Sequence, residues 1–210
     1  MKRILLNISI IAIVPFLLGF SSQSKIESLK IGEKAPMSNN KMKGVSGNDF
    51  SLSDLTQENG LLVIFSCNTC PFVIGNDNME GWEKRYNEIY EFSKLQRIGM
   101  VLVNSNEAKR SKGDSYNDMQ LHSRKQRYDS PYVIDRKSQL ADAFGASTTP
   151  HVFLFDNDLK LAYKGAIDDN VKSKKEVKET WLKNALQSLG KGESITLPET
   201  RNSGCSIKRL

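Results

Sequence analysis

The chain has 210 residues, of which 26% are charged and 39% hydrophobic, with 14 glycines, 6 prolines and 3 cysteines. This composition is typical of a globular protein, which excludes collagen-like, low-complexity and wholly disordered chains, and three cysteines are too few for a fold held together by disulfides. The net charge of +6 is modest and spread along the chain, so it is weak evidence for a nucleic-acid or membrane-surface partner.

The first 24 residues have the layout of a secretory signal peptide. Lys2 and Arg3 form a short positive segment, residues 4–20 are mostly apolar, and serines follow before ordinary polar sequence begins. An uncleaved anchor is the alternative, because the apolar segment approaches the length that spans about 30 Å of hydrocarbon. In both cases we expect the rest of the chain to be periplasmic or secreted, in a compartment where disulfides persist, with the membrane contacted only through an uncleaved N-terminal segment.

Short apolar runs alternate with amphipathic segments along the first half of the remaining chain. Continuous apolar runs are typical of strands buried on both faces, and apolar residues at helical spacing are typical of a helix with one buried face. The elements expected up to residue 127 are a hairpin within 45–55, a strand over 61–65, a helix over 79–96, a strand over 98–103 and a helix over 116–127. A polar loop over 104–115 lies between the last two, and its position predicts that it borders the active site.

The second half continues the alternation. Asp156-Asn157-Asp158 predicts a hairpin turn, and Ser173 with Glu176 forms a capping-box pair that predicts the start of the last helix. The expected elements are a strand over 131–134, a helix over 139–144, strands over 152–155 and 159–163, and a helix over 173–189. The pattern predicts one α/β domain over residues 25–190. Residues 191–210 lack periodicity and are expected to form a C-terminal tail that carries Cys205.

Two cysteines stand where the first buried strand is expected to meet a helix. Cys67 and Cys70 are separated by Asn68-Thr69 and followed by Pro71. Two thiols at this spacing can form a disulfide or open to a dithiol with little backbone motion, and a helix N-terminus favours the thiolate. Because the thiolate is the species that attacks in thiol–disulfide exchange, the pair predicts redox chemistry.

Three other interpretations of the cysteine pair carry less weight. A zinc site needs four ligands, and only Cys205, His122 and His151 remain as further ligands of the preferred kind. A haem c attachment needs a histidine directly after the second cysteine, where Pro71 stands. A purely structural disulfide would close a very short loop and would therefore stabilise the fold very little.

Several motifs resemble the redoxin branch of the thioredoxin-like superfamily, which includes thiol–disulfide oxidoreductases and alkyl hydroperoxide reductase/thiol-specific antioxidant proteins. The motifs are I-G-E-K-A-P from Ile31, F-S-L-S-D-L from Phe50, C-N-T-C-P from Cys67, Y-V-I-D from Tyr132, F-G-A-S-T-T-P-H-V-F-L-F-D from Phe144 and Y-K-G-A-I-D-D from Tyr163. The resemblance covers about residues 31–170. It implies an α/β thioredoxin-like fold, with a central mixed β-sheet flanked by helices, an N-terminal hairpin extension and a redoxin-type insertion.

The resemblance also implies roles for residues around Pro150. In the family the matching proline is cis and lies against the active-site cysteines, where a backbone edge docks the substrate's chain. Pro150 is therefore expected in the catalytic site and Thr149 along the docking edge, with Asn68, Thr69 and His151 as further candidate substrate contacts. For His151 the alternative is a histidine that is merely packed within its strand.

The sequence leaves open which cysteine attacks. The usual rule favours Cys67, the first of the pair. Pro71 at the first helical position would instead make Cys70 the N-cap residue, and a gapless match from the preceding strand also places Cys70 at the position of the first thioredoxin cysteine, so we favour Cys70 slightly. Cys205 either resolves a mixed disulfide or sulfenic acid, or is a free thiol on a loose tail.

The sequence thus predicts a thiol–disulfide oxidoreductase that exchanges disulfides with protein substrates and needs no metal or organic cofactor. Its electrons are expected from a partner, such as a membrane-borne thiol reductase, because the chain has no nucleotide-binding glycine motif. A redox-silent thioredoxin-fold binding module is one alternative.

A peroxiredoxin-like thiol peroxidase is the other alternative. Peroxiredoxins have a threonine three residues and a proline seven residues before the peroxidatic cysteine. Counting back from Cys70 gives Cys67 and Val63, and counting back from Cys67 gives Ile64 and Gly60. Neither frame fits the peroxidase pattern, so exchange with protein disulfides is the leading prediction.

Overall fold

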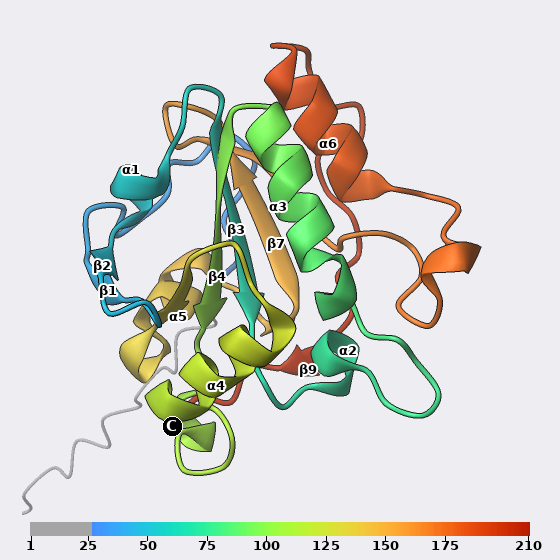
Figure 1. The fold of residues 1–210 in the computed structure, drawn as a ribbon. Helices are drawn as coiled ribbons and strands as arrows, with labels where there is room; N and C mark the ends of the chain where they lie inside the picture. The colour runs from blue at the N-terminus through green and yellow to red at the C-terminus, as the bar shows by residue number, and fades with distance from the viewer. Residues whose placement is uncertain (1–26) are drawn as a thin grey trace, which may run out of the picture.

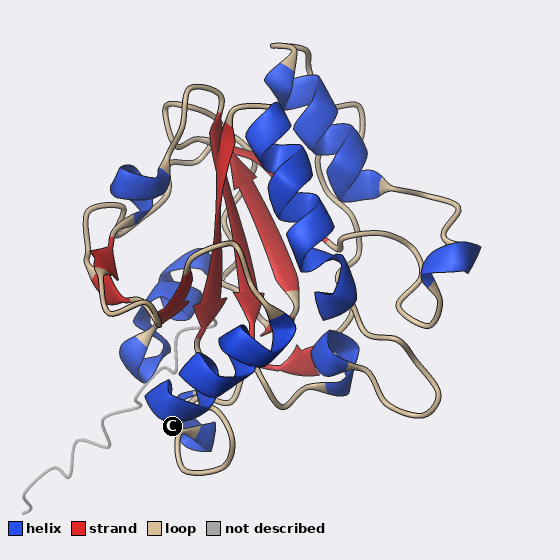
Figure 2. Cartoon of the chain, viewed as in Figure 1, coloured by secondary structure: helices blue, strands red, loops and turns tan. Residues whose placement is uncertain are grey.

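The computed structural model describes residues 27–210, and the predicted signal peptide over residues 1–24 lies outside them. A five-stranded mixed sheet forms the central layer, with helices on both sides (Figures 1 and 2). Its strands, in spatial order, are β5 (Tyr132–Ile134), β4 (Ile98–Asn104), β3 (Gly60–Ser66), β7 (His151–Phe155) and β8 (Leu161–Gly165). β3, β4 and β5 run parallel, whereas β7 is antiparallel to both of its neighbours. The predicted α/β class is confirmed.

Within residues 27–210 the remaining elements are two short strand pairs, six α-helices and four single 3₁₀ turns. The helices are α1 (Leu52–Leu55), α2 (Pro71–Ile74), α3 (Tyr86–Leu95), α4 (Tyr116–Gln126), α5 (Gln139–Phe144) and α6 (Trp181–Gly190). The strand pairs are β1 (Met42–Lys43) with β2 (Asp49–Phe50), and β6 (Thr148–Thr149) with β9 (Cys205–Ser206). The second pair joins a loop beside the sheet to the end of the chain.

Side chains along β3 alternate between two buried layers. Leu62 and Ile64 belong to one layer, and Leu61, Val63 and Phe65 to the other, and all five are fully buried. The first layer is covered mainly by α3 and α6, and the second by α1 and α5. Burial of a side chain of this size stabilises the fold by roughly 1.5–3 kcal/mol. The strand that leads into the cysteine pair is therefore held firmly on both faces.

Two predicted helices begin later than expected. The segment over 79–96 becomes helical only at Tyr86, because the chain first turns at Gly75 and Gly81, both with positive φ, and a side chain at either position would meet backbone atoms closer than 2.5 Å. Its expected apolar residue Leu95 is exposed. Apolar spacing alone could not place the start of the helix.

The last helix also starts late, at Trp181, so the capping box predicted at Ser173 is wrong. The side chain of Ser173 makes no cap, and only a single 3₁₀ turn follows it. The amide N–H of Ser173 donates instead to the side chain of Asn170, and that of Lys174 donates to Glu80. The backbone N–H groups of Ser173 and Lys174 are thus hydrogen-bonded to side chains outside a helix, and no helix starts here.

The N-terminal hairpin is confirmed with shifted bounds. β1 precedes the predicted range, the turn spans residues 44–48, and Ser51 with Asp54 caps the short helix α1 where the second half of the hairpin was expected.

No helix within residues 27–210 combines the length and apolar character needed to cross a bilayer.

The C-terminal segment returns to the sheet. The Thr200 N–H donates to the Lys164 carbonyl of β8 (3.0 Å), and the chain then passes along β6. Ile207 is 5% exposed and packs in the same apolar layer as Phe65. In Figure 1, β9 lies beside α2, at the end of the sheet where β3 finishes.

Candidate active site

The two closely spaced cysteines lie at the carboxyl end of β3. Cys67 directly follows the strand, and Cys70 is the residue that precedes α2, with Pro71 at the first helical position as predicted. Proline suits that position because its φ is helical and the first amide has no helical partner. Both thiols are inside the protein, since Cys67 is 0% and Cys70 3% exposed.

Thr149 contacts both sulfur atoms. The Cys70 thiol donates to the Thr149 carbonyl with a Sγ–O distance of 3.1 Å, and the Cys67 Sγ lies 3.2 Å from the Thr149 hydroxyl. The Thr149–Pro150 peptide bond is cis, as the family resemblance implied. The structure therefore brings together four of the predicted site positions, the two cysteines and the Thr149–Pro150 dipeptide.

The residues between the cysteines are held by a buried carboxylate. Asp114, which is 0% exposed, accepts hydrogen bonds from the Asn68 N–H (2.7 Å) and the Thr69 hydroxyl (2.7 Å). It also accepts from the side-chain amides of Asn104 (2.8 Å) and Asn106 (3.2 Å). Asn68 and Thr69, predicted as substrate contacts, thus use these polar groups to fix the loop between the thiols.

Sequence analysis predicted that the polar loop borders the site but did not single out Asp114. A lone carboxylate in a loop has no periodicity to mark it. Its one signal was position, since the loop leaves β4, and the carboxyl ends of parallel neighbours β3 and β4 lie together. Tyr132 on β5 completes the arrangement, because its hydroxyl donates to the Asn68 side-chain oxygen at 2.9 Å.

The protein environment separates the pKa values of the two thiols. Hydrogen bonding from the Cys67 thiol, and after it from Cys205 and Thr149, lowers the pKa of Cys70 to about 5 despite its burial. Burial raises the pKa of Cys67, and the bond to Cys70 and the charge of Asp114 raise it further. These opposite shifts favour the thiolate on Cys70 over the thiolate on Cys67.

His151 lies within β7 and is 5% exposed. Its ring packs on Phe153 with centroids 4.5 Å apart, and its Nδ1 accepts a hydrogen bond from the Ser147 N–H at 3.3 Å. Burial, together with the charge of Lys164, lowers the pKa of His151 to about 3, so the ring is neutral at physiological pH. The structure places it as a packed strand residue and shows it bonded to backbone.

Cys205 lies in β9, which pairs antiparallel with β6. The pairing sets Cys205 opposite Thr149, the residue that contacts both other sulfurs. Burial and hydrogen bonding to Cys70 raise the pKa of Cys205 to about 11. No periodicity around Cys205 predicted where it would lie, and the structure brings it to the cysteine pair.

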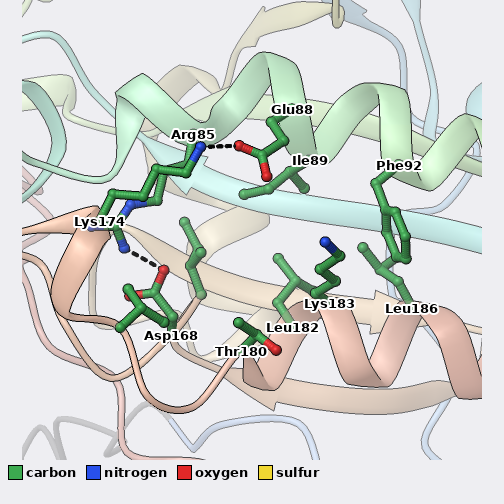
Figure 3. A pocket seen from close by; sticks show the side chains of 12 residues that line it. Arg85, Glu88, Ile89, Phe92, Asp168, Lys174, Thr180, Leu182, Lys183 and Leu186 are labelled. Atoms are coloured by element: carbon green, nitrogen blue, oxygen red, sulfur yellow. Dashed lines mark hydrogen bonds and ion pairs between the residues drawn. The ribbon is translucent and has the colours of Figure 1, made fainter.

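The other histidine and an apolar pocket between α3 and α6 lie away from the thiols. The His122 ring bonds to Glu83, with Nε2 and Oε2 2.6 Å apart. Figure 3 shows the pocket between α3 and α6, where Arg85 pairs with Asp168. None of the residues that line this pocket is a cysteine, and neither Thr149 nor Asp114 lines it. Among residues 27–210, no group of three His, Cys, Asp or Glu side chains is arranged to hold a metal ion.

Replacing Cys67 by alanine should raise the pKa of Cys70 toward the ordinary value of about 8.5, whereas serine should not. Because the folded pKa is lowered, thiolate forms as the pH rises through about 5 and is lost as the pH falls below it. Serine still offers a hydroxyl donor to the Cys70 thiolate, and alanine offers none. Thiolate absorbance near 240 nm, followed against pH in the reduced protein, measures the midpoint, and equal midpoints for the two variants would contradict this assignment.

Comparisons with known proteins show the family and the fold of the chain. The sequence model of the Redoxin family matches residues 30–181, whereas a search of curated proteins gives no match. A hypothetical protein from Sinorhizobium meliloti is similar in structure, with 27% identity and a TM-score of 0.77 over 88% of this chain and 97% of that one.

Two functionally described structures share the fold at lower identity. The peroxidoxin BcpB from Mycobacterium tuberculosis is 15% identical, with a TM-score of 0.54 over 79% of this chain and 99% of that one. The thioredoxin domain of a thiol-disulfide oxidoreductase from Bacteroides vulgatus is 18% identical, with a TM-score of 0.51 over 66% of this chain and 90% of that one. These likenesses confirm the thioredoxin-like fold.

Proposed function

Since the chain belongs to the redoxin family, we propose that it is a thiol–disulfide oxidoreductase in which Cys70 attacks and Cys67 resolves. The observation that carries this proposal is the placement of two thiols three residues apart between β3 and α2, both in contact with Thr149, which precedes the cis Pro150. A thiol with a lowered pKa has as its donor a second thiol three residues away that keeps its proton. A thiolate is the attacking species, and a nearby protonated thiol is the reserve that completes the exchange.

The exchange takes two steps. The Cys70 thiolate attacks one sulfur of a substrate disulfide, forms a mixed disulfide, and releases the other substrate sulfur as a thiolate. Cys67 then gives up its proton to that thiolate or to solvent and attacks the Cys70 sulfur. The second substrate sulfur leaves, the Cys67–Cys70 disulfide forms, and two electrons have passed to the substrate. A dithiol donor must return two electrons before the next cycle.

The proposed setting is the periplasm or the cell exterior, with disulfide-containing proteins as substrates. The N-terminal sequence pattern supports the location, and a membrane-borne thiol reductase fits as the donor because the sequence carries no nucleotide-binding glycine motif. Asn68 and Thr69 are held by Asp114 and so fix the separation of the two sulfurs.

The test is catalysis of insulin disulfide reduction by dithiothreitol. We expect micromolar protein to shorten the delay before reduced insulin chains aggregate, and the Cys67→Ser/Cys70→Ser double variant to leave it at the uncatalysed value. Consumption of hydrogen peroxide or an organic peroxide is measured on the same samples. Rapid peroxide loss without insulin reduction would replace the proposal by a thiol peroxidase, and activity in neither assay would replace it by a redox-silent binding module.

A further inference from the structure

The backbone edge of β6 is occupied by the chain's own C-terminal strand. Thr149 pairs with Cys205 and Thr148 with Ser206 in an antiparallel ladder. The side-chain amide of Asn202 adds a hydrogen bond to the Thr148 hydroxyl at 2.7 Å. The edge that a substrate strand would use is therefore filled from within the molecule.

Gly204 makes this approach possible. A Cβ atom on Gly204 would lie 2.4 Å from the Thr149 carbonyl oxygen and 3.0 Å from the Thr148 Cβ. The first distance is far inside van der Waals contact and involves backbone, so any side chain at this position would push the strand away. The glycine before Cys205 thus matches a close packing of the strand against β6.

The strand is anchored on its far side as well. Ile207 is buried, and its N–H donates to the Ser147 carbonyl at 3.0 Å. The Lys208 N–H donates to the Asn106 side chain at 2.9 Å, and the Arg209 guanidinium donates to the Ala146 carbonyl at 2.7 Å. Cys205 is therefore fixed between Gly204 and a buried anchor, in contrast to a thiol on a loose tail.

Cys205 packs against the apolar cluster that contains both Cys67 and Cys70. Its pairing partner Thr149 is also the residue whose carbonyl oxygen accepts from the Cys70 thiol at 3.1 Å. Cys70 itself is 3% exposed. The third cysteine therefore lies on the same short backbone segment that the Cys70 thiol contacts.

We propose that Cys205 is an internal exchange partner of Cys70, so that the oxidised protein interconverts between a Cys67–Cys70 and a Cys70–Cys205 disulfide. The inference rests on the proposed function, since it requires Cys70 to react with disulfides. The supporting geometry is the ladder that sets Cys205 opposite Thr149, the bond from the Cys70 thiol to the Thr149 carbonyl, and the packing of Cys205 against the cluster that contains both other cysteines.

Each step conserves electrons. In the oxidised protein, the deprotonated Cys205 sulfur attacks Cys70, forms the Cys70–Cys205 bond and expels Cys67 as a thiolate, which takes up a proton. In a mixed disulfide between Cys70 and a substrate, the same attack expels the substrate sulfur. Attack of Cys67 on Cys70 then returns Cys205 as a thiol and leaves the Cys67–Cys70 disulfide. The Cys70–Cys205 bond is thus one stage of the same two-electron cycle.

Disulfide mapping of the Cys67→Ser variant tests the proposal. The reduced variant is treated with glutathione disulfide, the remaining thiols are alkylated, and the protein is digested with trypsin without reduction. Cleavage after lysine and arginine places Cys70 in residues 44–84 and Cys205 in residues 202–208. We expect these two peptides to be joined in most molecules of a monomeric product. Cys70→Ser, which leaves Cys67 and Cys205, should give at least tenfold less of the corresponding link.

Gly204→Val leaves every cysteine in the sequence and should displace only the strand that carries Cys205. Combined with Cys67→Ser, it should lower the yield of joined peptides at least tenfold while far-ultraviolet circular dichroism stays unchanged. Glutathione on Cys70 with Cys205 free in the Cys67→Ser variant would overturn the proposal. The wild-type digest reports separately on the proposed function. A protein that after oxidation holds neither a disulfide within residues 44–84 nor a link from them to residues 202–208 would overturn the proposed function, whereas a disulfide within residues 44–84 alone would leave it standing.

Discussion

Cys70→Ser should abolish disulfide exchange, lowering the rate of insulin reduction by about three orders of magnitude or more, as expected when a covalent nucleophile is removed. Cys70 is the thiol whose pKa is lowered, and its Sγ lies against the Thr149 carbonyl. A serine hydroxyl at this position stays protonated and cannot form the mixed disulfide. The rate is measured with dithiothreitol as the donor.

Cys67→Ser is the matched comparison, because it removes the other thiol of the same pair. It should keep the attacking sulfur and accumulate mixed disulfides with substrate, visible as adducts on non-reducing gels. In this variant Cys205 competes for the same sulfur, so adducts are best followed in Cys67→Ser/Cys205→Ser. If Cys70→Ser formed the adducts and Cys67→Ser did not, the two roles would have to be exchanged.

Asp114→Ala should lower the free energy of unfolding by about 4 kcal/mol or more. The side chain is fully buried and accepts four hydrogen bonds, each to a charged acceptor and worth roughly 1.5–3 kcal/mol. Alanine would leave four donors without their partner, two of them on the buried residues Asn104 and Asn106, and losses of this size are typical of a broken buried network. Urea unfolding of the reduced protein, followed by circular dichroism, measures the change.

Asp129→Ala is the control, since it removes an exposed carboxylate and should leave the urea midpoint close to that of the wild type. A similar midpoint for Asp114→Ala would show that the network does not hold the loop.

Asp114→Asn, which keeps the size of the side chain, should destabilise the fold less than alanine. It should also lower the pKa of Cys67, because the charge of the Asp114 carboxylate contributes to raising that pKa.

The sequence was sufficient for the elements that local patterns determine. A continuous apolar run predicted β3, and the two cysteines after it, followed by proline, predicted the junction with α2. The family motifs placed Thr149 and Pro150 near the thiols. These features depend on residues that are neighbours in the chain or belong to recurrent motifs, so a single sequence carries them.

The remaining features depend on contacts between distant segments. Asp114 lies in an aperiodic loop, and Cys205 lies in a segment without hydrophobic spacing, yet each reaches the site through hydrogen bonds formed only in the folded chain. The capping pair at Ser173 shows that distant contacts can also override a local pattern. The local sequence matches a capping box, but the Ser173 N–H donates to the Asn170 side chain and the helix begins only at Trp181.

Because β9 pairs with β6, whose Thr149 contacts both sulfurs, the surroundings of the cysteine pair depend on a segment encoded far downstream of codons 67 and 70. A frameshift or a premature stop codon after Arg201 would remove that strand while leaving both cysteines in the translated chain.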